Sequence, residues 1–244
     1  MKSRRIKTVL FILCMLLLSI GQTQAAITLA GSRVIYPGER KNVSIELTNK
    51  GDTAVLVQSW LDSGDASRQP GEEALPFVIT PPVTRVEARS GQTLRLAYIN
   101  RILPQDRESL FWLNVLEIPP KLSAAENLNT MQVALRTRIK MLFRPAGLKG
   151  SVAQGAERLQ WRWGNITPAG QELIAENSSP FYLNFASFQI SWPGGGDSID
   201  IAPIPPKGQH IFIVKQLRNA PSNASINGRW INDYGSSSTI HYSL

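Results

Sequence analysis

The sequence predicts an all-β protein built from two antiparallel β-sandwich domains. Short apolar runs recur about every 8–12 residues after position 26, and turn residues such as Pro37-Gly38 and Ser90-Gly91 separate them, as is typical of sandwich strands. The pattern stops at 145–150, where one proline and two glycines interrupt it, and then resumes. Residues 26–244 also suit two domains of roughly 100 residues each. We therefore expect domains at 26–145 and 146–244.

Residues 1–25 have the build of a secretory signal peptide. A basic start precedes an apolar run of about a dozen residues at 9–20, and the small residues Ala25 and Ala26 follow. Because this run is too short for a comfortable transmembrane helix, we expect export and cleavage after Ala25. The only cysteine, Cys14, leaves with the leader. The mature chain is therefore expected to be soluble and to fold without disulfides or cysteine-bound metal.

Charge and chemistry exclude several classes of function. The leader holds four of the 26 basic residues and no acidic one, which leaves 22 basic and 18 acidic residues and a net charge of +4. This charge suits a pocket for one acidic group better than a nucleic-acid surface. The two histidines, His210 and His241, lack ligand-spaced partners, and neither a nucleophile elbow nor a phosphate loop is present. We expect no enzyme activity, no cofactor, no metal, no nucleic-acid partner and no small-molecule substrate.

The first domain is expected to hold about seven strands. Alternating apolar residues, as in Val43, Ile45 and Leu47, indicate strands with one buried face. Pro81-Pro82 should break a ladder or lie at a sheet edge, because proline has no N–H to donate. The expected strand segments are 27–29 leading to 34–36, 43–47, 55–60, 77–79, 94–98, 110–115 and 131–144.

The segment 131–144 is the most unusual of these strands. Nearly all of its odd positions are apolar, and four of its even positions are basic. At about 3.3 Å per residue it would reach on the order of 45 Å, about twice the usual strand length. Two explanations remain open. Either the strand bends into a second packing environment, or part of its apolar row is meant for another chain.

The second domain is predicted to be all-β as well. Its expected strands are 159–163, 172–175, 181–185, 188–192, 210–214, 229–231 and 239–242, with turns at 193–196 and 203–208.

Several motifs carry a resemblance to a known family. Residues 103–120 read LPQDRESLFWLNVLEIPP and residues 137–145 read TRIKMLFRP, while GSRVIYPGE, TPPVTRVE and INDYG stand at 31–39, 80–87 and 231–235. Together they resemble the periplasmic pilus-assembly (fimbrial) chaperones of the chaperone–usher pathway in Gram-negative bacteria. The resemblance implies two immunoglobulin-like sandwich domains joined by a short hinge, with a cleft between them. It also implies a periplasmic protein that binds fimbrial subunits by donating a β-strand and delivers them to an outer-membrane usher.

The resemblance assigns two groups of residues to the binding of subunits. Arg33 and Lys140 match the cleft cations that anchor the C-terminal carboxylate of a pilus subunit. Two cations placed in advance can hold one carboxylate through charge-assisted hydrogen bonds, each worth roughly 1.5–3 kcal/mol. Met131, Val133 and Leu135 match the alternating apolar residues of the donated strand. Since an exposed apolar edge promotes aggregation, free molecules are expected to cover it, for example by self-association.

A third group, Glu108, Arg144 and Asp233, matches a charge cluster that holds the two domains at a fixed angle. The short segment 121–130 resembles the short-loop branch of the family, and the chain departs from members that have a disulfide in the second domain. The alternative function is a surface-assembled structural or adhesive immunoglobulin-like protein. That class would need a spare terminal arm, whereas the expected mature chain begins almost directly on its first strand.

Overall fold

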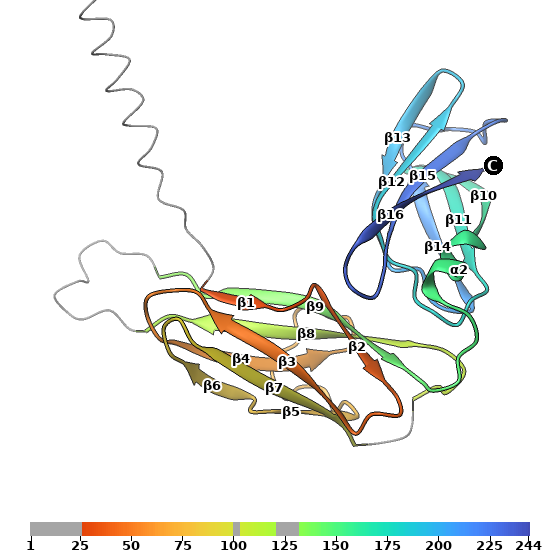
Figure 1. Cartoon of the computed structure of the whole chain (residues 1–244). Helices are drawn as coiled ribbons and strands as arrows, with labels where there is room; N and C mark the ends of the chain where they lie inside the picture. The colour runs from red at the N-terminus through yellow and green to blue at the C-terminus, as the bar shows by residue number, and fades with distance from the viewer. Residues whose placement is uncertain (1–25, 100–102, 121–131) are drawn as a thin grey trace, which may run out of the picture.

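The computed structural model describes residues 26–99, 103–120 and 132–244, and two β-sandwich domains account for them (Figure 1). In the first domain the described strands form a four-stranded sheet in the order β1-β3-β7-β5 and a five-stranded sheet in the order β2-β9-β8-β4-β6. Their bounds are β1 (Ile27–Leu29), β2 (Arg33–Pro37), β3 (Asn42–Asn49), β4 (Val55–Asp62), β5 (Phe77–Thr80), β6 (Val83–Val86), β7 (Gly91–Tyr98), β8 (Ser109–Ile118) and β9 (Leu135–Arg144).

Two segments of the first domain cross from one sheet to the other. β1 pairs with β3, but β2 pairs in parallel with β9 in the opposite sheet. In the same way β5 pairs with β7, and β6 pairs with β4 across the sandwich. Pro81-Pro82 lies between β5 and β6, which confirms that this proline pair breaks the ladder. When each crossing segment is counted as one strand, the domain has the expected seven strands of an immunoglobulin-like sandwich.

An aromatic cluster fills the first core near the second domain. Tyr36, Phe77, Tyr98 and Phe143 lie within 4.7–6.5 Å of one another between ring centroids. The buried Tyr36 hydroxyl donates to the Arg40 carbonyl at 3.1 Å and accepts the Tyr98 N–H at 3.0 Å. The ring therefore enters the core without leaving its hydroxyl unpaired.

β9 is shorter than the sequence pattern indicates. It begins at Leu135, whereas the segment 131–144 was expected to be one strand, and described residues 132–134 lie outside any strand. The last pair of the ladder joins Glu117 of β8 to Leu135. Pro119 and Pro120 follow on the β8 side and cannot donate the N–H groups that a longer ladder needs. Met131 and the segment 121–130 lie outside the described residues.

The second domain consists of two further sheets, β10-β11-β14 and β13-β12-β15-β16, packed around an apolar core. Its elements are α2 (Val152–Glu157), β10 (Gln160–Thr167), β11 (Gly170–Asn177), β12 (Phe185–Trp192), β13 (Gly195–Ile199), β14 (Gly208–Val214), β15 (Ser225–Ile231) and β16 (Ser237–Ser243). The expected strand at 181–185 does not form: Leu183 pairs with Ile204 in an isolated bridge, and β12 begins at Phe185. The Asn177 amide donates to the Phe181 carbonyl at 2.8 Å, so a side chain replaces part of the ladder there.

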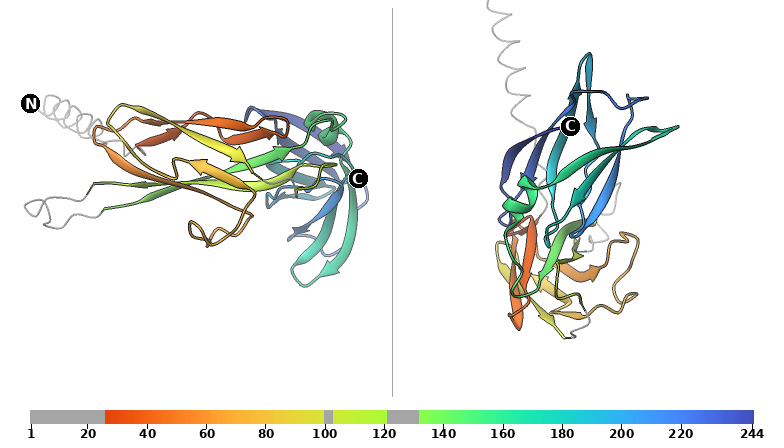
Figure 2. Two further views of the ribbon diagram at one scale, coloured as in Figure 1. Left: turned by 90° about the horizontal axis from the view of Figure 1, so that it is seen from below. Right: turned by 90° about the vertical axis from the view of Figure 1, so that its right-hand side faces the viewer.

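The second domain rises at an angle from one end of the first (Figures 1 and 2). The loop that joins β15 to β16 points back toward β2 and β9. Within the described parts of the chain, we find no helix with the length and apolar character needed to cross a membrane.

Candidate functional site

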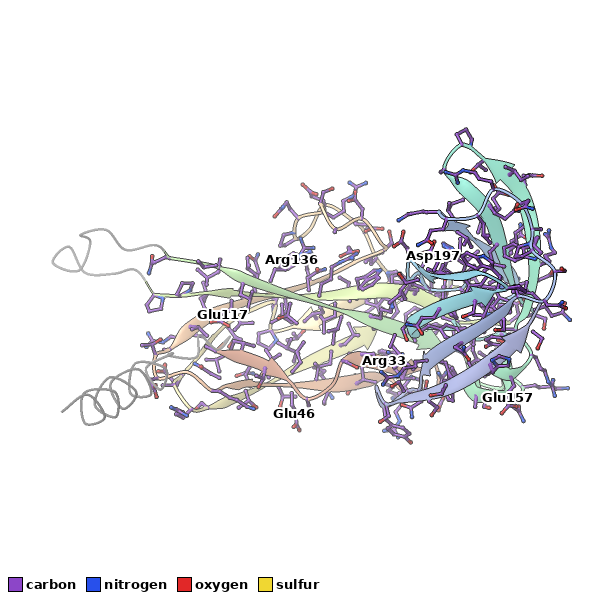
Figure 3. All side chains as sticks on the ribbon, turned by 90° about the horizontal axis from the view of Figure 1, so that it is seen from above. Arg33, Glu46, Glu117, Arg136, Glu157 and Asp197 are labelled. Atoms are coloured by element: carbon purple, nitrogen blue, oxygen red, sulfur yellow. The ribbon has the colours of Figure 1, made fainter. Side chains whose placement is uncertain are left out.

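Arg33 and Lys140 lie side by side where the two domains meet. They are a register pair in the parallel ladder between β2 and β9, so the two side chains leave the sheet on the same face. Figure 3 shows Arg33 beside the strands of the second domain. Both residues are half-buried, and neither forms an ion pair with an acidic residue in the described parts of the chain.

The electrostatics of this cationic pair favour an anion. Burial, together with the neighbouring Arg33 charge, lowers the pKa of Lys140 to about 8. Burial also lowers the pKa of Arg33, and the charge of Asp233 opposes that shift. The Arg33 Nε is buried without a hydrogen-bond partner among the described residues. A carboxylate placed here would relieve the repulsion and pair the orphaned donor.

The turn between β15 and β16 packs against the start of β2. The Asn232 side chain accepts the N–H groups of Tyr234 and Ser236, each at 3.0 Å, which makes the turn rigid. Gly235 has φ +85°, and a Cβ on it would lie 2.5 Å from the Ser32 hydroxyl. The positive φ and the close approach of Ser32 therefore both favour glycine at this position.

The structure brings Glu108, Arg144 and Asp233 together across the domain junction. The Arg144 guanidinium donates to Glu108 at 2.6 Å and, through two nitrogens, to Asp233 at 2.7 and 2.8 Å. Glu108 also accepts the Tyr182 N–H at 2.7 Å. Burial raises the pKa of Glu108 against the opposing effect of Arg144, and although burial alone would lower the pKa of Arg144, Asp233 and Glu108 raise it. Glu108, a buried carboxylate of the first domain, thus connects to the second domain in two ways. It binds Arg144, which also binds Asp233 of the second domain, and it accepts a backbone N–H of the second domain.

The outer half of β9 has an open edge. β2 covers β9 only at residues 140–144, so residues 135–139 have β8 on one side and no described strand on the other. Along the same face Met141 and Phe143 are buried, whereas Leu135 is 43% exposed and Val133 is 63% exposed. Ile139 lines a hollow of about 340 Å³ next to this edge. The apolar row of the strand therefore leaves its own core before it ends.

The polar face of β9 contains a group that we did not predict from the sequence. Asp62 at the end of β4 is fully buried and pairs with both Arg136 and Arg138. In the sequence, the basic residues at even positions of 131–144 indicated only the cationic side of this group. The acidic partner is 76 residues away from Arg138 in the sequence, and only the register of β4, β8 and β9 brings the two together.

The two histidines lie apart from this site. His210 on β14 packs edge-to-face against Phe212 with ring centroids 4.6 Å apart, and burial lowers the pKa of His210. The imidazole Nδ1 of His241 on β16 lies 2.9 Å from the Asn227 amide oxygen. Among the described residues there is no group of three or more potential ligands that could hold a metal ion.

Comparison with known proteins gives one consistent result. The model of the pili and flagellar-assembly chaperone PapD N-terminal domain matches residues 26–149, and the model of the PapD C-terminal domain matches residues 154–242. The chain is 40% identical over 228 residues to the probable fimbrial chaperone YadV of Escherichia coli K12, with 92% of each chain covered. It is 38% identical over 215 residues to the chaperone protein HifB of Haemophilus influenzae, with 86% of this chain and 85% of HifB covered.

Solved structures agree with the sequence relatives. The crystal structure of the YadV chaperone matches with a TM-score of 0.77 and 38% identity, over 90% of this chain and 100% of that one. The Salmonella enterica SafB chaperone, solved in complex with the SafA pilin, matches with a TM-score of 0.74 and 27% identity, over 92% and 99% of the chains. Fimbrial chaperones are folding and assembly helpers and not enzymes. The chain belongs to the PapD-like family of fimbrial chaperones of the chaperone–usher pathway.

Proposed function

We propose that this chaperone captures fimbrial subunits in the periplasm, anchors their C-terminal carboxylate on Arg33 and Lys140, and lends them the open edge of β9. The guest then passes to an outer-membrane usher, where a strand from a neighbouring subunit replaces β9. Residues 133–139 are the donor segment of this proposal, with Met131 as its extension beyond the described residues. SafB, a structural relative, was solved with a pilin, which supports a fimbrial subunit as the partner.

One observation carries the anchor. Four cations stand at even positions of β9, and Arg136, Arg138 and Arg144 each pair with a carboxylate of the same chain. Lys140 lies between them, beside Arg33, and has no acidic partner in the described part of the chain. A like-charge pair that is half-buried costs free energy in the free protein. We therefore interpret the half-buried pair of Arg33 and Lys140 as a binding site for an anion from another molecule.

The donor segment follows from the geometry of the same strand. A carboxylate held at Lys140 fixes where the guest polypeptide meets β9, and the open edge at 135–139 offers main-chain groups for pairing. Leu135 and Val133 project from alternate positions and would enter apolar pockets of the guest. Binding of the carboxylate at Lys140 therefore also sets the register in which the guest pairs with residues 135–139.

Co-expression with a fimbrial subunit tests the proposal. We expect a soluble one-to-one complex with the wild-type chaperone and loss of the complex with Lys140→Ala or Arg33→Ala. Arg89→Ala is the matched control, because Arg89 forms an exposed ion pair with Asp52 in the same domain. Recovery of the complex at wild-type yield with both Lys140→Ala and Arg33→Ala would rule out the anchor.

A second experiment tests the location and the proposed processing. Cell fractionation should place the protein in the periplasm, and N-terminal sequencing of the mature protein should begin at Ala26. A cytoplasmic protein that retains residues 1–25 would contradict this part of the proposal.

A further inference from the structure

The donor segment of β9 poses a mechanical problem. Residues 140–144 are held between β2 and β8, whereas residues 135–139 have only β8 beside them. Their apolar face also leaves the core toward the start of the strand, since Ile139 still packs against the core but Leu135 is 43% exposed. A strand with one neighbour and one free face frays easily, and ordering it during binding would cost affinity.

The opposite face of the same segment is tied to β4, two strands away. Arg138 makes two hydrogen bonds to the buried Asp62 carboxylate, one of them 3.0 Å long from Nε to Oδ2. The Asn114 amide donates to the same carboxylate at 2.7 Å, and its oxygen accepts two bonds from Arg136 at 2.9 and 2.7 Å. One carboxylate thus holds both basic residues of the donor segment, Arg138 directly and Arg136 mainly through Asn114.

Two tryptophans support this network. The Arg136 guanidinium carbon lies 4.7 Å from the centroid of the Trp60 ring, and that of Arg138 lies 4.1 Å from the Trp112 ring. The Lys140 ammonium is 5.4 Å from the same Trp112 ring. Stacking on the rings restricts the rotamers of the arginine side chains. The ring of Trp112 also brings Lys140 into contact with the network.

The loop that follows β4 closes over the network. The Arg136 guanidinium donates to the Ala66 carbonyl at 2.7 Å, that of Arg138 donates to the Gly64 carbonyl at 3.0 Å, and Asp62 accepts the Gly64 N–H at 2.8 Å. Burial of the Asp62 carboxyl opposes its ionisation, but hydrogen bonds from Arg138, Asn114 and Gly64 hold its pKa below the usual range. The carboxylate is therefore charged and fully satisfied when the protein is free.

We propose that Asp62 is a positioning residue for strand donation: through Arg136, Arg138 and Asn114 it holds residues 135–139 in strand geometry before a guest arrives. This inference rests on the proposed function, because it assigns a purpose to the rigidity of the donor segment. The side chains at even positions of this segment bind groups of their own domain, so those at odd positions are free to contact the guest.

Three variants test the proposal. Asp62→Asn keeps the size and one acceptor of the side chain but removes its charge. Asp62→Asn combined with Arg138→Gln removes the unpaired arginine as well and separates loss of the tie from the cost of a buried charge. Asp52→Asn is the matched control, because Asp52 also accepts two bonds from one arginine, Arg89, but at the exposed surface.

The first readout is hydrogen exchange in the free chaperone, which requires no guest. Both Asp62 variants should speed exchange of the amides in 135–139 that face β8 by about tenfold or more, the effect of a tie worth about 1.4 kcal/mol. Amides in 140–144 should keep their wild-type rates, because β2 still covers them. Equal acceleration of both halves, or wild-type rates at 135–139, would overturn the proposal.

The second readout is the rate at which the chaperone captures a fimbrial subunit. Both Asp62 variants should form the strand-donated complex more slowly, while the affinity for a short peptide that ends in the C-terminal carboxylate of a pilin stays within about twofold of wild type. Capture at the wild-type rate by a variant with a mobile 135–139 would also overturn the inference. Failure of the wild-type chaperone to capture any pilin would instead refute the proposed function, and the exchange experiment would still decide whether Asp62 positions the strand.

Discussion

The protonation of Lys140 gives the sharpest test of the carboxylate anchor. Its pKa is about 8 in the free protein, against 10.5 for an ordinary lysine, because burial and the Arg33 charge both disfavour the ammonium form. Only the charged form can pair with a carboxylate. Binding should therefore weaken as the pH rises through 8, a range in which the C-terminal carboxylate of the guest and an arginine keep their charge.

The magnitude follows from the titration. An ammonium group with a pKa of about 8 is about nine-tenths protonated at pH 7 and about one-tenth protonated at pH 9. A bound carboxylate raises this pKa again, so the complex takes up a proton as it forms. The dissociation constant of a peptide that carries the free C-terminus of a pilin should rise about tenfold between pH 7 and pH 9.

Isothermal titration calorimetry across this range measures both effects. Repeating each titration in buffers of different ionisation enthalpy gives the number of protons taken up. Lys140→Arg is the control, because a guanidinium stays charged over the whole range and should make the affinity nearly independent of pH. A peptide with an amidated C-terminus should bind weakly at every pH, since it presents no carboxylate.

The lowered pKa of Lys140 also determines how the free energy of unfolding depends on pH. Because the folded-state pKa lies below 10.5, the unfolded chain binds more protons between pH 8 and pH 10.5, and the contribution of Lys140 to the free energy of unfolding rises with pH in that window. Lys140→Met should therefore be stabilising near pH 7 and lose its advantage toward pH 10.5.

For the carboxylate anchor itself, a wild-type peptide affinity that stays flat from pH 7 to 9, or an equal pH dependence of the affinity in Lys140→Arg, would refute the reasoning.

Three further predictions concern the frame around the anchor. Arg144→Ala leaves the buried Glu108 without its cation and should lower the free energy of unfolding by roughly 3–5 kcal/mol in urea, and a loss below about 1 kcal/mol would show that the junction does not depend on the pair. Gly235→Ala should cost on the order of 1–3 kcal/mol and clearly more than Gly147→Ala, because both glycines have φ above +80° but only Gly235 faces a neighbour within 4 Å. Leu135→Glu should change the stability of the free protein by less than about 0.5 kcal/mol but reduce the yield of the chaperone–pilin complex, whereas collapse of the fold would make Leu135 a core residue.

The fold could be predicted from the sequence because its strands alternate cleanly and its turns are marked by glycine and proline. The segment 43–47 shows why, since its apolar residues alternate with polar ones and β3 extends over the same positions. Weak local signals hid two elements of the second domain. Helix α2 spans only six residues, and β13 begins with two glycines that have low strand propensity. Neither element has a sequence period long enough to be recognised.

The start of β9 shows a different limit. The apolar alternation already includes Val133, so periodicity alone cannot show that β9 begins at Leu135. The ladder begins at the pair Leu135–Glu117, and on the partner side Pro119 and Pro120 follow β8 and have no N–H groups to extend it. Which residues form a ladder depends on both partners, and a single strand carries only half of that information.

The candidate site shows the same dependence in its charges. By strand periodicity alone the four cations of β9 are equivalent, because each occupies an even position of one alternating strand, and only the family motif distinguishes Lys140 and Arg144. The fold makes them different by placing Asp62 beside Arg136 and Arg138, and Glu108 and Asp233 beside Arg144. These carboxylates come from β4, the start of β8 and the β15–β16 turn.

Lys140 remains in register with Arg33, whose charge lowers the pKa of Lys140. A half-buried like-charge pair costs stability, and a nearby carboxylate would remove that cost. Asp62 is in register with Trp112, and Trp112 is in register with Lys140, so a carboxylate one strand closer than Asp62 would lie opposite Lys140 and compensate its charge. Placing such a carboxylate, for example with Trp112→Glu directly opposite Lys140 on β8, should raise the pKa of Lys140 toward that of an ordinary lysine and compete with the carboxylate of the guest. If that variant still bound the pilin peptide with wild-type affinity, the unpaired charge would not be what the chaperone uses for capture.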